Sequence, residues 1–142
     1  MQSDYCMPYM QIKKKEEMKF VLIDDDLSTN VYHRIILDKY KSITPSIEYN
    51  FFDCAMEALE FLKQESIEQP KYIFLDINMP KMSGWEFVEE YNKLDLEKAE
   101  IIMLSTSHDP KDQEKTEDYE NVLAFRKKPL SFNILEELCK AV

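Results

Sequence analysis

The stretch Phe20-Val-Leu-Ile-Asp-Asp-Asp26 consists of four apolar residues followed by three carboxylates, and two later apolar runs also end on charged residues. Tyr72-Ile-Phe-Leu75 ends on Asp76, and Val122-Leu-Ala-Phe125 ends on Arg126-Lys-Lys-Pro129. If these runs are neighbouring parallel strands, their carboxyl ends meet at one edge of the sheet. Open α/β sheets bind ligands in the crevice beyond those ends. The sequence therefore predicts a site at this edge that combines three carboxylates with a lysine.

Short apolar runs alternate with longer amphipathic stretches from Met18 onward. Five runs have the length and composition of β-strands, and each precedes a segment with a helix signal. Five strands alternating with five helices in about 125 residues predict an α/β fold, a doubly wound five-stranded parallel sheet with helices on both faces. The predicted strands are residues 19–23, 47–52, 72–75, 101–104 and 122–125, and the predicted helix caps are Ser28 or Thr29, Asp53, Ser83, Asp109 and Ser131.

The apolar pattern also predicts which residues these elements bury. Glu48 and Asn50 alternate with apolar residues in the second strand, which we therefore place at an edge of the sheet. The fourth helix, starting at Asp109-Pro110, has almost no apolar residue, so we expect a mobile or partner-dependent element. The expected buried residues are Val31, Ile35 and Ile36 in the first helix, with Tyr40 as a further candidate, Met56, Leu59, Phe61 and Leu62 in the second, Trp85, Val88 and Tyr91 in the third, and Ile134, Leu135 and Leu138 in the last.

The chain has the size of one domain and an acidic composition. At 142 residues and 44% hydrophobic composition, it can bury one substantial core. We expect a flexible N-terminal extension over residues 1–17 and a folded domain over residues 18–142. The net charge of -10 argues against binding to nucleic acid or to an anionic membrane, because both need a basic surface.

Cysteine and glycine usage limits the location and the cofactors. Cys6, Cys54 and Cys139 are too scattered for a disulfide framework or a zinc site, and no apolar run is long enough for a signal peptide or a membrane span. We therefore expect a cytoplasmic protein. Gly84 is the only glycine, so the chain cannot build a glycine-rich loop that cradles a nucleotide phosphate.

The acids at the predicted site would repel one another if all of them were ionised. A hard divalent cation would offset this charge, and Mg²⁺ prefers oxygen ligands such as carboxylates. Lys128 would supply a second positive charge at the opposite rim. A cation and an ammonium group on either side of a free carboxylate suit its attack on a phosphoryl group, with an aspartyl phosphate as the product.

A hydroxyl group is expected at the same edge, because Ser105 and Thr106 follow the fourth apolar run. It could donate to a phosphoryl oxygen. Taken alone, such hydroxyls often simply end strands, and Asp24-Asp25-Asp26 could equally cap a helix. Compatible chemistry at four separate strand ends favours one shared site.

Four segments resemble the receiver domain of two-component response regulators. The most specific is Phe74-Leu-Asp-Ile-Asn-Met-Pro-Lys-Met-Ser-Gly84, and the others are Lys19-Phe-Val-Leu-Ile-Asp-Asp-Asp26, Met103-Leu-Ser105 and Lys128-Pro129-Leu130. The resemblance covers about residues 18–142 and implies a CheY-like form of the flavodoxin-like fold. The chain ends at Val142, and we expect a stand-alone receiver.

The resemblance also implies a role for each site residue. Asp76 would accept the phosphoryl group from a phosphohistidine of a histidine kinase or a phosphotransfer protein. Mg²⁺ would be bound directly by Asp25, Asp76 and the backbone carbonyl of Asn78, and through water by Asp24. Ser105 and Lys128 would contact the phosphoryl group, Phe125 would be the aromatic switch, and Pro129 would follow a cis peptide bond.

The implied output is a change in affinity for an unidentified downstream protein, by a shift of a pre-existing equilibrium. Such a protein is a signalling phosphoacceptor that promotes its own phosphorylation and dephosphorylation, not an enzyme with a separate substrate. His33 and His108 are expected at a surface or an interface, without a metal or phosphoryl role.

Three alternatives stay open at this point. A Mg²⁺-dependent aspartyl-phosphate hydrolase would use similar ions, but it usually needs a second acid where this chain has Asn78. A flavodoxin-like cofactor binder shares the topology, although acid in its first loop would repel the cofactor phosphate. A degenerate receiver would act only as a binding module, yet all five site positions are intact.

Overall fold

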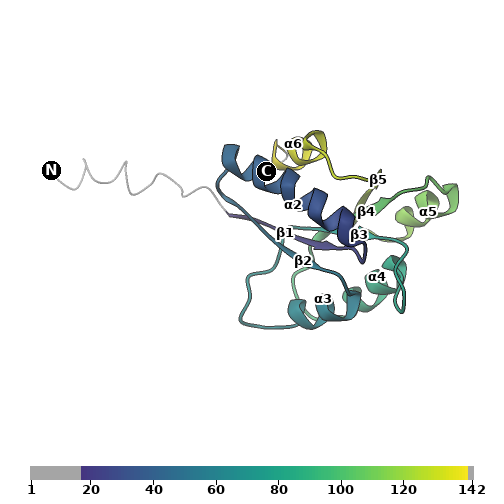
Figure 1. Cartoon of the computed structure of the whole chain (residues 1–142). Helices are drawn as coiled ribbons and strands as arrows, with labels where there is room; N and C mark the ends of the chain where they lie inside the picture. Colours follow the sequence, from purple (N-terminus) through teal and green to yellow (C-terminus); the bar gives the residue numbers. More distant parts are fainter. Residues whose placement is uncertain (1–16, 141–142) are drawn as a thin grey trace.

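The computed structural model describes residues 17–140, which form one five-stranded parallel sheet flanked by helices (Figure 1). The strand order is β2-β1-β3-β4-β5, which confirms the predicted fold class. The predicted extension over residues 1–17 lies outside the described residues, except for Glu17. The strands are β1 (Met18–Ile23), β2 (Ile47–Phe52), β3 (Tyr72–Asp76), β4 (Glu100–Ser105) and β5 (Val122–Lys127). The helices are α2 (Leu27–Ile43), α3 (Ala55–Leu62), α4 (Gly84–Asn92), α5 (Pro110–Lys115) and α6 (Phe132–Lys140), with the short 3-10 helix η1 (Thr116–Asp118) after α5.

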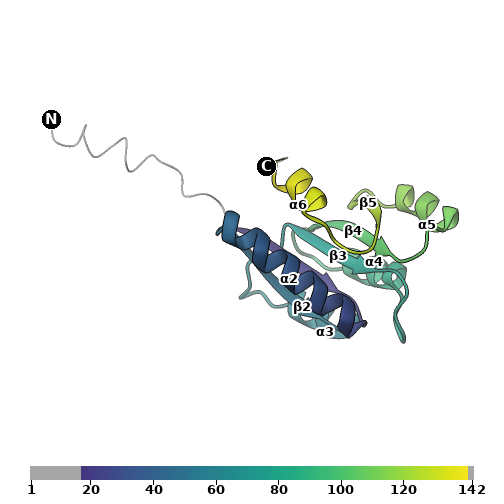
Figure 2. The same cartoon turned by 45° about the horizontal axis from the view of Figure 1, so that its top comes forward.

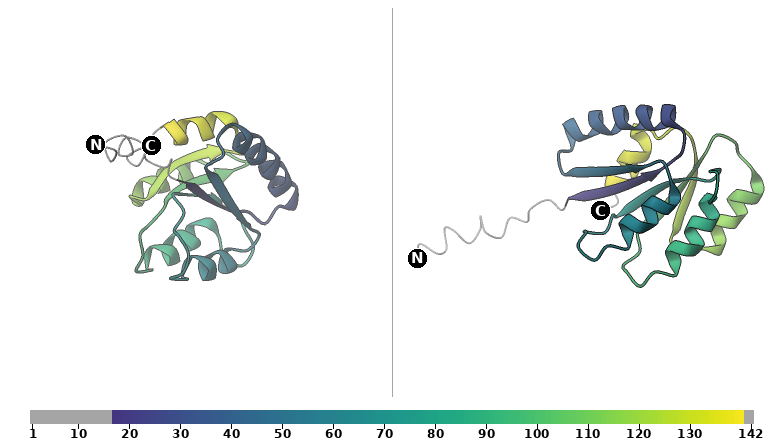
Figure 3. Two further views of the ribbon diagram at one scale, coloured as in Figure 1. Left: turned by 90° about the vertical axis from the view of Figure 1, so that its left-hand side faces the viewer. Right: turned by 60° about the horizontal axis from the view of Figure 1, so that its bottom comes forward.

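Each face of the sheet packs against its own layer of helices. Helices α2 and α6 cover one face, while α3 and α4 cover the other, with α5 beside α4 (Figure 2, Figure 3). Successive residues of β1 alternate between the two cores: Phe20 and Leu22 pack toward α2 and α6, and Val21 and Ile23 toward α3 and α4. Because helices cover both faces, the central strands are continuous apolar runs, and all five residues of β3 are buried.

Strand β2 lies at one edge of the sheet, as its alternating sequence predicted, and β5 lies at the other. The pairing register brings the carboxyl ends of the inner strands together. Ile23 pairs with Leu75, so Asp24 follows β1 at the level where β3 ends on Asp76. Ser105 in β4 pairs with Lys127 in β5, which places Lys128 one residue further along.

The predicted start and buried face of α2 are partly wrong. Its N-cap is Asp26, not Ser28 or Thr29, because the Asp26 side chain accepts the hydrogen bond from the backbone N–H of Ser28. Val31 and Ile35 are 60% and 49% exposed. The helix instead buries His33, Leu37 and Tyr40, of which only Tyr40 had been named as a candidate.

The predictions for α3 and α4 mostly hold. Helix α3 buries Leu59 and Leu62, but Met56 is half exposed, and the N-cap is Cys54 instead of Asp53, without a side-chain cap. Helix α4 begins after Ser83, whose hydroxyl and the Glu86 carboxylate form a reciprocal capping box. It buries the three predicted residues Trp85, Val88 and Tyr91.

Helix α5 has only six residues and buries none of them, in agreement with its polar sequence. Polar and aromatic contacts connect it to α4. The indole N–H of Trp85 donates to Asp112 at 2.9 Å, and the Trp85 ring stacks on Tyr119 with 5.7 Å between centroids. The Lys115 ammonium lies 5.5 Å from the centroid of the Trp85 ring. The Trp85 side chain thus connects α4 to Asp112 and Lys115 of α5 and to Tyr119, which follows η1.

Helix α6 follows Ser131, whose hydroxyl accepts from the backbone N–H of Ile134 at 3.3 Å, as a cap residue should. It buries Leu135 and Leu138, while Ile134 is partly buried. Within residues 17–140, no helix is both long enough and apolar enough to cross a bilayer.

Candidate functional site

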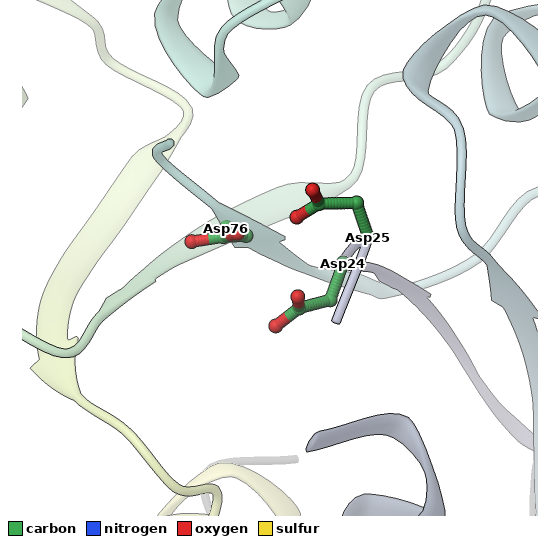
Figure 4. A group of neighbouring side chains, drawn as sticks. All are labelled: Asp24, Asp25 and Asp76. Atoms are coloured by element: carbon green, nitrogen blue, oxygen red, sulfur yellow. The ribbon is translucent and has the colours of Figure 1, made fainter. Parts of the chain in front are cut away.

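The three predicted acids meet beyond the carboxyl ends of β1 and β3. Asp24 and Asp25 follow β1, and Asp76 is the last residue of β3. One carboxylate oxygen from each lies within 4.8 Å of the others. Figure 4 shows the three side chains at these neighbouring strand ends. The sheet register therefore assembles a cluster that is dispersed over 53 positions of sequence, from 24 to 76.

The two acids that follow β1 have different surroundings. Asp24 is 4% exposed, and its Oδ1 accepts from the backbone N–H of Asp26 at 2.9 Å. Its backbone carbonyl accepts from the side-chain amide of Asn30 at 2.8 Å. Asp25 is exposed, and its carboxylate faces solvent at the rim of the cluster. Asp24 is therefore fixed by the first turns of α2, whereas Asp25 is open to a ligand.

Lys128 bridges the two buried acids. Its ammonium nitrogen lies 2.6 Å from Asp24 Oδ2 and 3.1 Å from Asp76 Oδ1, and all three side chains are no more than 8% exposed. Burial alone would lower the pKa of Lys128, but its hydrogen bonds and the charges of Asp24 and Asp76 outweigh this and raise it. The lysine is therefore charged, and it lies between the acids instead of at an opposite rim.

The environment of Asp76 favours its protonated form more than water does. Burial, followed by the charge of Asp24, raises the pKa of Asp76 to about 6. Lys128 and the backbone N–H of Asn78 act in the opposite direction. Bringing a further positive charge to the carboxylate would favour its ionised form.

The other predicted site residues are Ser105 in β4, Asn78 in the loop after β3 and Phe125 in β5. Ser105 is buried at the end of β4, and its Oγ accepts from the backbone N–H of Ser107 at 3.2 Å. Asn78 is exposed in the loop after β3. Phe125 is partly buried in β5, and its ring meets His108 edge to face with 5.5 Å between centroids. The structure thus brings every predicted site residue to the same end of the sheet.

The peptide bond between Lys128 and Pro129 is cis, as the resemblance implied. The Lys128 N–H donates to the backbone carbonyl of Ser105 at 2.8 Å. This bond fixes the start of the segment that carries the lysine.

Two residues have roles that the sequence did not reveal. A Cβ atom on Gly84 would lie 2.5 Å from the backbone oxygen of Asp76, so this position needs glycine for a close approach of α4 to β3. His33, predicted at a surface or an interface, is 1% exposed, and its Nε2 accepts from the backbone N–H of Leu130 at 2.9 Å. Its spacing with Leu37 and Tyr40 was the available signal.

The donor set at the cluster suits a hard cation. Three carboxylates with oxygens within 4.8 Å of one another provide the oxygen chemistry that Mg²⁺ prefers. The described cysteines, Cys54 and Cys139, are free thiols. The residues present therefore fit Mg²⁺ better than a soft metal, which would favour thiolate ligands.

Comparisons with known proteins identify the family to which this fold and sequence are similar. The sequence model of the response regulator receiver domain matches residues 20–140. A two-component response regulator from Cytophaga hutchinsonii superposes with a TM-score of 0.77 at 28% identity, over 89% of this chain and 97% of that one. Response regulator Rcp1 from Synechocystis is 29% identical over 66% of either chain. A response regulatory protein from Staphylococcus epidermidis is 29% identical over 84% of this chain, which spans only 44% of the length of that relative.

Proposed function

Because this chain belongs to the family of response regulator receiver domains, we propose that Asp76 accepts a phosphoryl group from a phosphohistidine of a histidine kinase or a phosphotransfer protein. The observation that carries this proposal is the bridge from Lys128 to Asp24 and Asp76 beside the exposed acid Asp25. It combines a nucleophilic carboxylate with a fixed positive charge in a mostly buried site. Such a combination suits phosphoryl transfer, where positioning and charge stabilisation supply most of the catalysis.

In the proposed transfer, a carboxylate oxygen of Asp76 forms a bond to phosphorus while the bond from phosphorus to the donor imidazole nitrogen breaks. The electron pair of the broken bond stays on the imidazole, and the product on this chain is an aspartyl phosphate. Lys128 stabilises the negative charge that develops on the phosphoryl oxygens. Its 2.6 Å contact with Asp24 would keep it at the site after Asp76 has reacted.

Mg²⁺ would be held directly by Asp25, Asp76 and the backbone carbonyl of Asn78, and through water by Asp24. Both carboxylate oxygens of Asp24 already have partners, Oδ1 the Asp26 N–H and Oδ2 the Lys128 ammonium, which supports an indirect role. When bound, the ion would supply further positive charge for the phosphoryl oxygens.

We also propose a change of conformation as the output. The Ser105 hydroxyl, whose oxygen accepts from the Ser107 N–H at 3.2 Å, would turn its O–H toward a phosphoryl oxygen on Asp76, and this movement would draw Ser107 with it. The loop that contains Ser107 also carries His108, whose ring packs on Phe125. Movement of this loop would turn Phe125 inward and displace the weakly held helix α5, thereby changing affinity for a downstream protein.

Labelling by a small phosphodonor with Mg²⁺ tests the acceptor. Asp76→Asn should abolish labelling, whereas the matched variant Asp53→Asn, which removes an exposed acid after β2 at the same sheet edge, should label like the parent. Equal labelling of the parent and Asp76→Asn would refute the assignment.

A second variant tests the output. Lys128→Ala should still accept a phosphoryl group, but phosphorylation should no longer change its binding to a downstream partner isolated with the parent protein. If the parent binds that partner with the same affinity in both states, the proposed switch is wrong.

A further inference from the structure

His33 is a buried side chain of α2 that the proposed phosphoryl chemistry does not use. It shares the inner face of the helix with Leu37 and Tyr40. Its Nε2 accepts the hydrogen bond from the backbone N–H of Leu130, 97 positions later in the sequence. This bond connects α2 to the segment that leads from β5 into α6.

The bond from Leu130 acts on the segment that carries Lys128. Pro129 has no N–H group, so the backbone donors of this segment belong to Lys128 and Leu130. The Lys128 N–H donates to the Ser105 carbonyl, and any side chain at position 105 would keep that bond. The bond from Leu130 instead requires an accepting side chain at position 33.

The same helix holds the acid that pairs with the lysine. The Asn30 amide donates to the backbone carbonyl of Asp24 at 2.8 Å, and Asp24 Oδ2 lies 2.6 Å from the Lys128 ammonium. Helix α2 therefore forms a hydrogen bond to the backbone near each member of this ion pair. Asn30 bonds to Asp24 itself, and His33 bonds to Leu130, two residues after Lys128.

We propose that His33 is a positioning residue for Lys128, holding the segment from Lys128 to Leu130 against α2 so that the ammonium group lies between Asp24 and Asp76. This inference rests on the proposed function, which assigns Lys128 to the phosphoryl group. His33 does not touch the reacting atoms, and it acts only through the backbone of Leu130.

The state of the His33 ring is consistent with this role. An accepting Nε2 needs a free lone pair, so the ring is neutral and carries its proton on Nδ1. Burial, the largest effect, lowers the pKa of His33 to about 4; the charge of Asp24 opposes this shift, and that of Lys128 adds to it. The ring is therefore an acceptor at neutral pH.

Two substitutions separate the hydrogen bond from the volume of the ring. His33→Leu removes the acceptor, while His33→Gln places an oxygen at nearly the reach of Nε2. The full chain is phosphorylated with acetyl phosphate to obtain initial rates, and MgCl₂ is titrated by calorimetry to obtain Mg²⁺ affinity. A misplacement of 1 Å can cost about 10²-fold in rate, and Lys128 keeps its bond to Ser105, so we expect a loss of about tenfold for His33→Leu. His33→Gln should recover most of the rate, and Mg²⁺ affinity should not fall in either variant.

A double substitution tests whether the effect passes through the lysine. In a Lys128→Ala background, His33→Leu should cause no further loss of rate, because the group that it positions is gone. An equal loss in both backgrounds would overturn the proposal. So would a parent rate in His33→Leu, a parallel loss of Mg²⁺ affinity, or a folded His33→Gln that is as slow as His33→Leu.

Failure of this inference differs from failure of the proposed function. Labelling of Asp76→Asn at the parent level would refute the phosphoacceptor, whereas parent-like rates in His33→Leu refute only the positioning role. If circular dichroism shows that His33→Leu does not fold, His33→Asn replaces it with the same expected losses. The shorter asparagine side chain does not reach the Leu130 N–H.

Discussion

Gly84 should be highly sensitive to substitution, because an added methyl group would press on the backbone of the proposed phosphoacceptor. A Cβ atom there would lie 2.5 Å from the backbone carbonyl oxygen of Asp76 and 2.9 Å from the Cα of Ile77. Both neighbours are backbone atoms, and contacts of real Cβ atoms essentially never fall under 3.0 Å, so at least 0.5 Å must open. Overpacking of this kind costs about 1–3 kcal/mol. For a chain of this size, that loss lowers Tm by about 4–12 °C.

The same displacement should slow phosphorylation. A misplacement of 1 Å can cost about 10²-fold in rate, so a shift of about 0.5 Å in Asp76 predicts a loss of about tenfold in Gly84→Ala. Thermal melting followed by circular dichroism and labelling with acetyl phosphate and Mg²⁺ measure the two effects.

Ser83→Ala is the matched control for this experiment. It removes the hydroxyl that caps the same helix, at a cost of about 1 kcal/mol, and adds no atom near Asp76. Its phosphorylation rate should equal that of the parent. The reasoning is refuted if Gly84→Ala melts at the parent temperature, or if both variants lose rate by the same factor.

Three other predictions follow from the charges and contacts of the site. Mg²⁺ affinity, measured by calorimetry, should fall about tenfold from pH 7 to pH 5. Burial and the charge of Asp24 raise the pKa of Asp76 to about 6, and a carboxyl group must be ionised to bind the ion. A constant affinity over this pH range would contradict the prediction. The fluorescence of Trp85, the only tryptophan, should change on phosphorylation as α5 moves. Asp112→Ala removes the acceptor of the Trp85 indole N–H and should weaken that change. Identical spectra of the phosphorylated and unphosphorylated protein would count against α5 as the moving element. Burial lowers the pKa of His33 from 6.5 to about 4, so the folded chain binds fewer protons than the unfolded chain between pH 6.5 and pH 4. Above pH 6.5, His33 should not reduce the free energy of unfolding. Between pH 6.5 and pH 4, it should lower that free energy by up to about 3 kcal/mol. Urea unfolding of His33→Gln should lack this decline, and an equal decline in both proteins would exclude His33 as its source.

The strands and the acidic edge could be predicted because each signal is local. An apolar run that stops on a charged residue identifies both the strand and the edge where its side chains meet, and Asp76 is the clearest case. The buried face of α2 could not be predicted in this way. It includes the polar residue His33, while the apolar residues Val31 and Ile35 are exposed, so a search for an apolar stripe selects the wrong side.

Contacts between distant segments could not be predicted from the sequence either. The pattern indicated that Lys128 belongs to the site, but its position between the two buried acids depends on the path of the segment after β5. That path is fixed by partners from β4 and α2, namely the Ser105 carbonyl and His33. Neither bond has a sequence signature, since one uses only backbone atoms and the other joins residues 97 positions apart.

The different burial of the three acids supports a different role for each of them. Asp24 and Asp76 are buried, and two buried carboxylates without a cation would be unfavourable, so Lys128 offsets their charge before any metal binds. Asp25 is exposed and has no such partner among the described ion pairs, which leaves a carboxylate at the solvent-facing rim. Asp25 would therefore be the carboxylate of the cluster that is most accessible to Mg²⁺ from solvent. Phosphorylation of Asp76 would add negative charge next to a lysine that Asp24 already holds in place, so the positive charge needs little rearrangement.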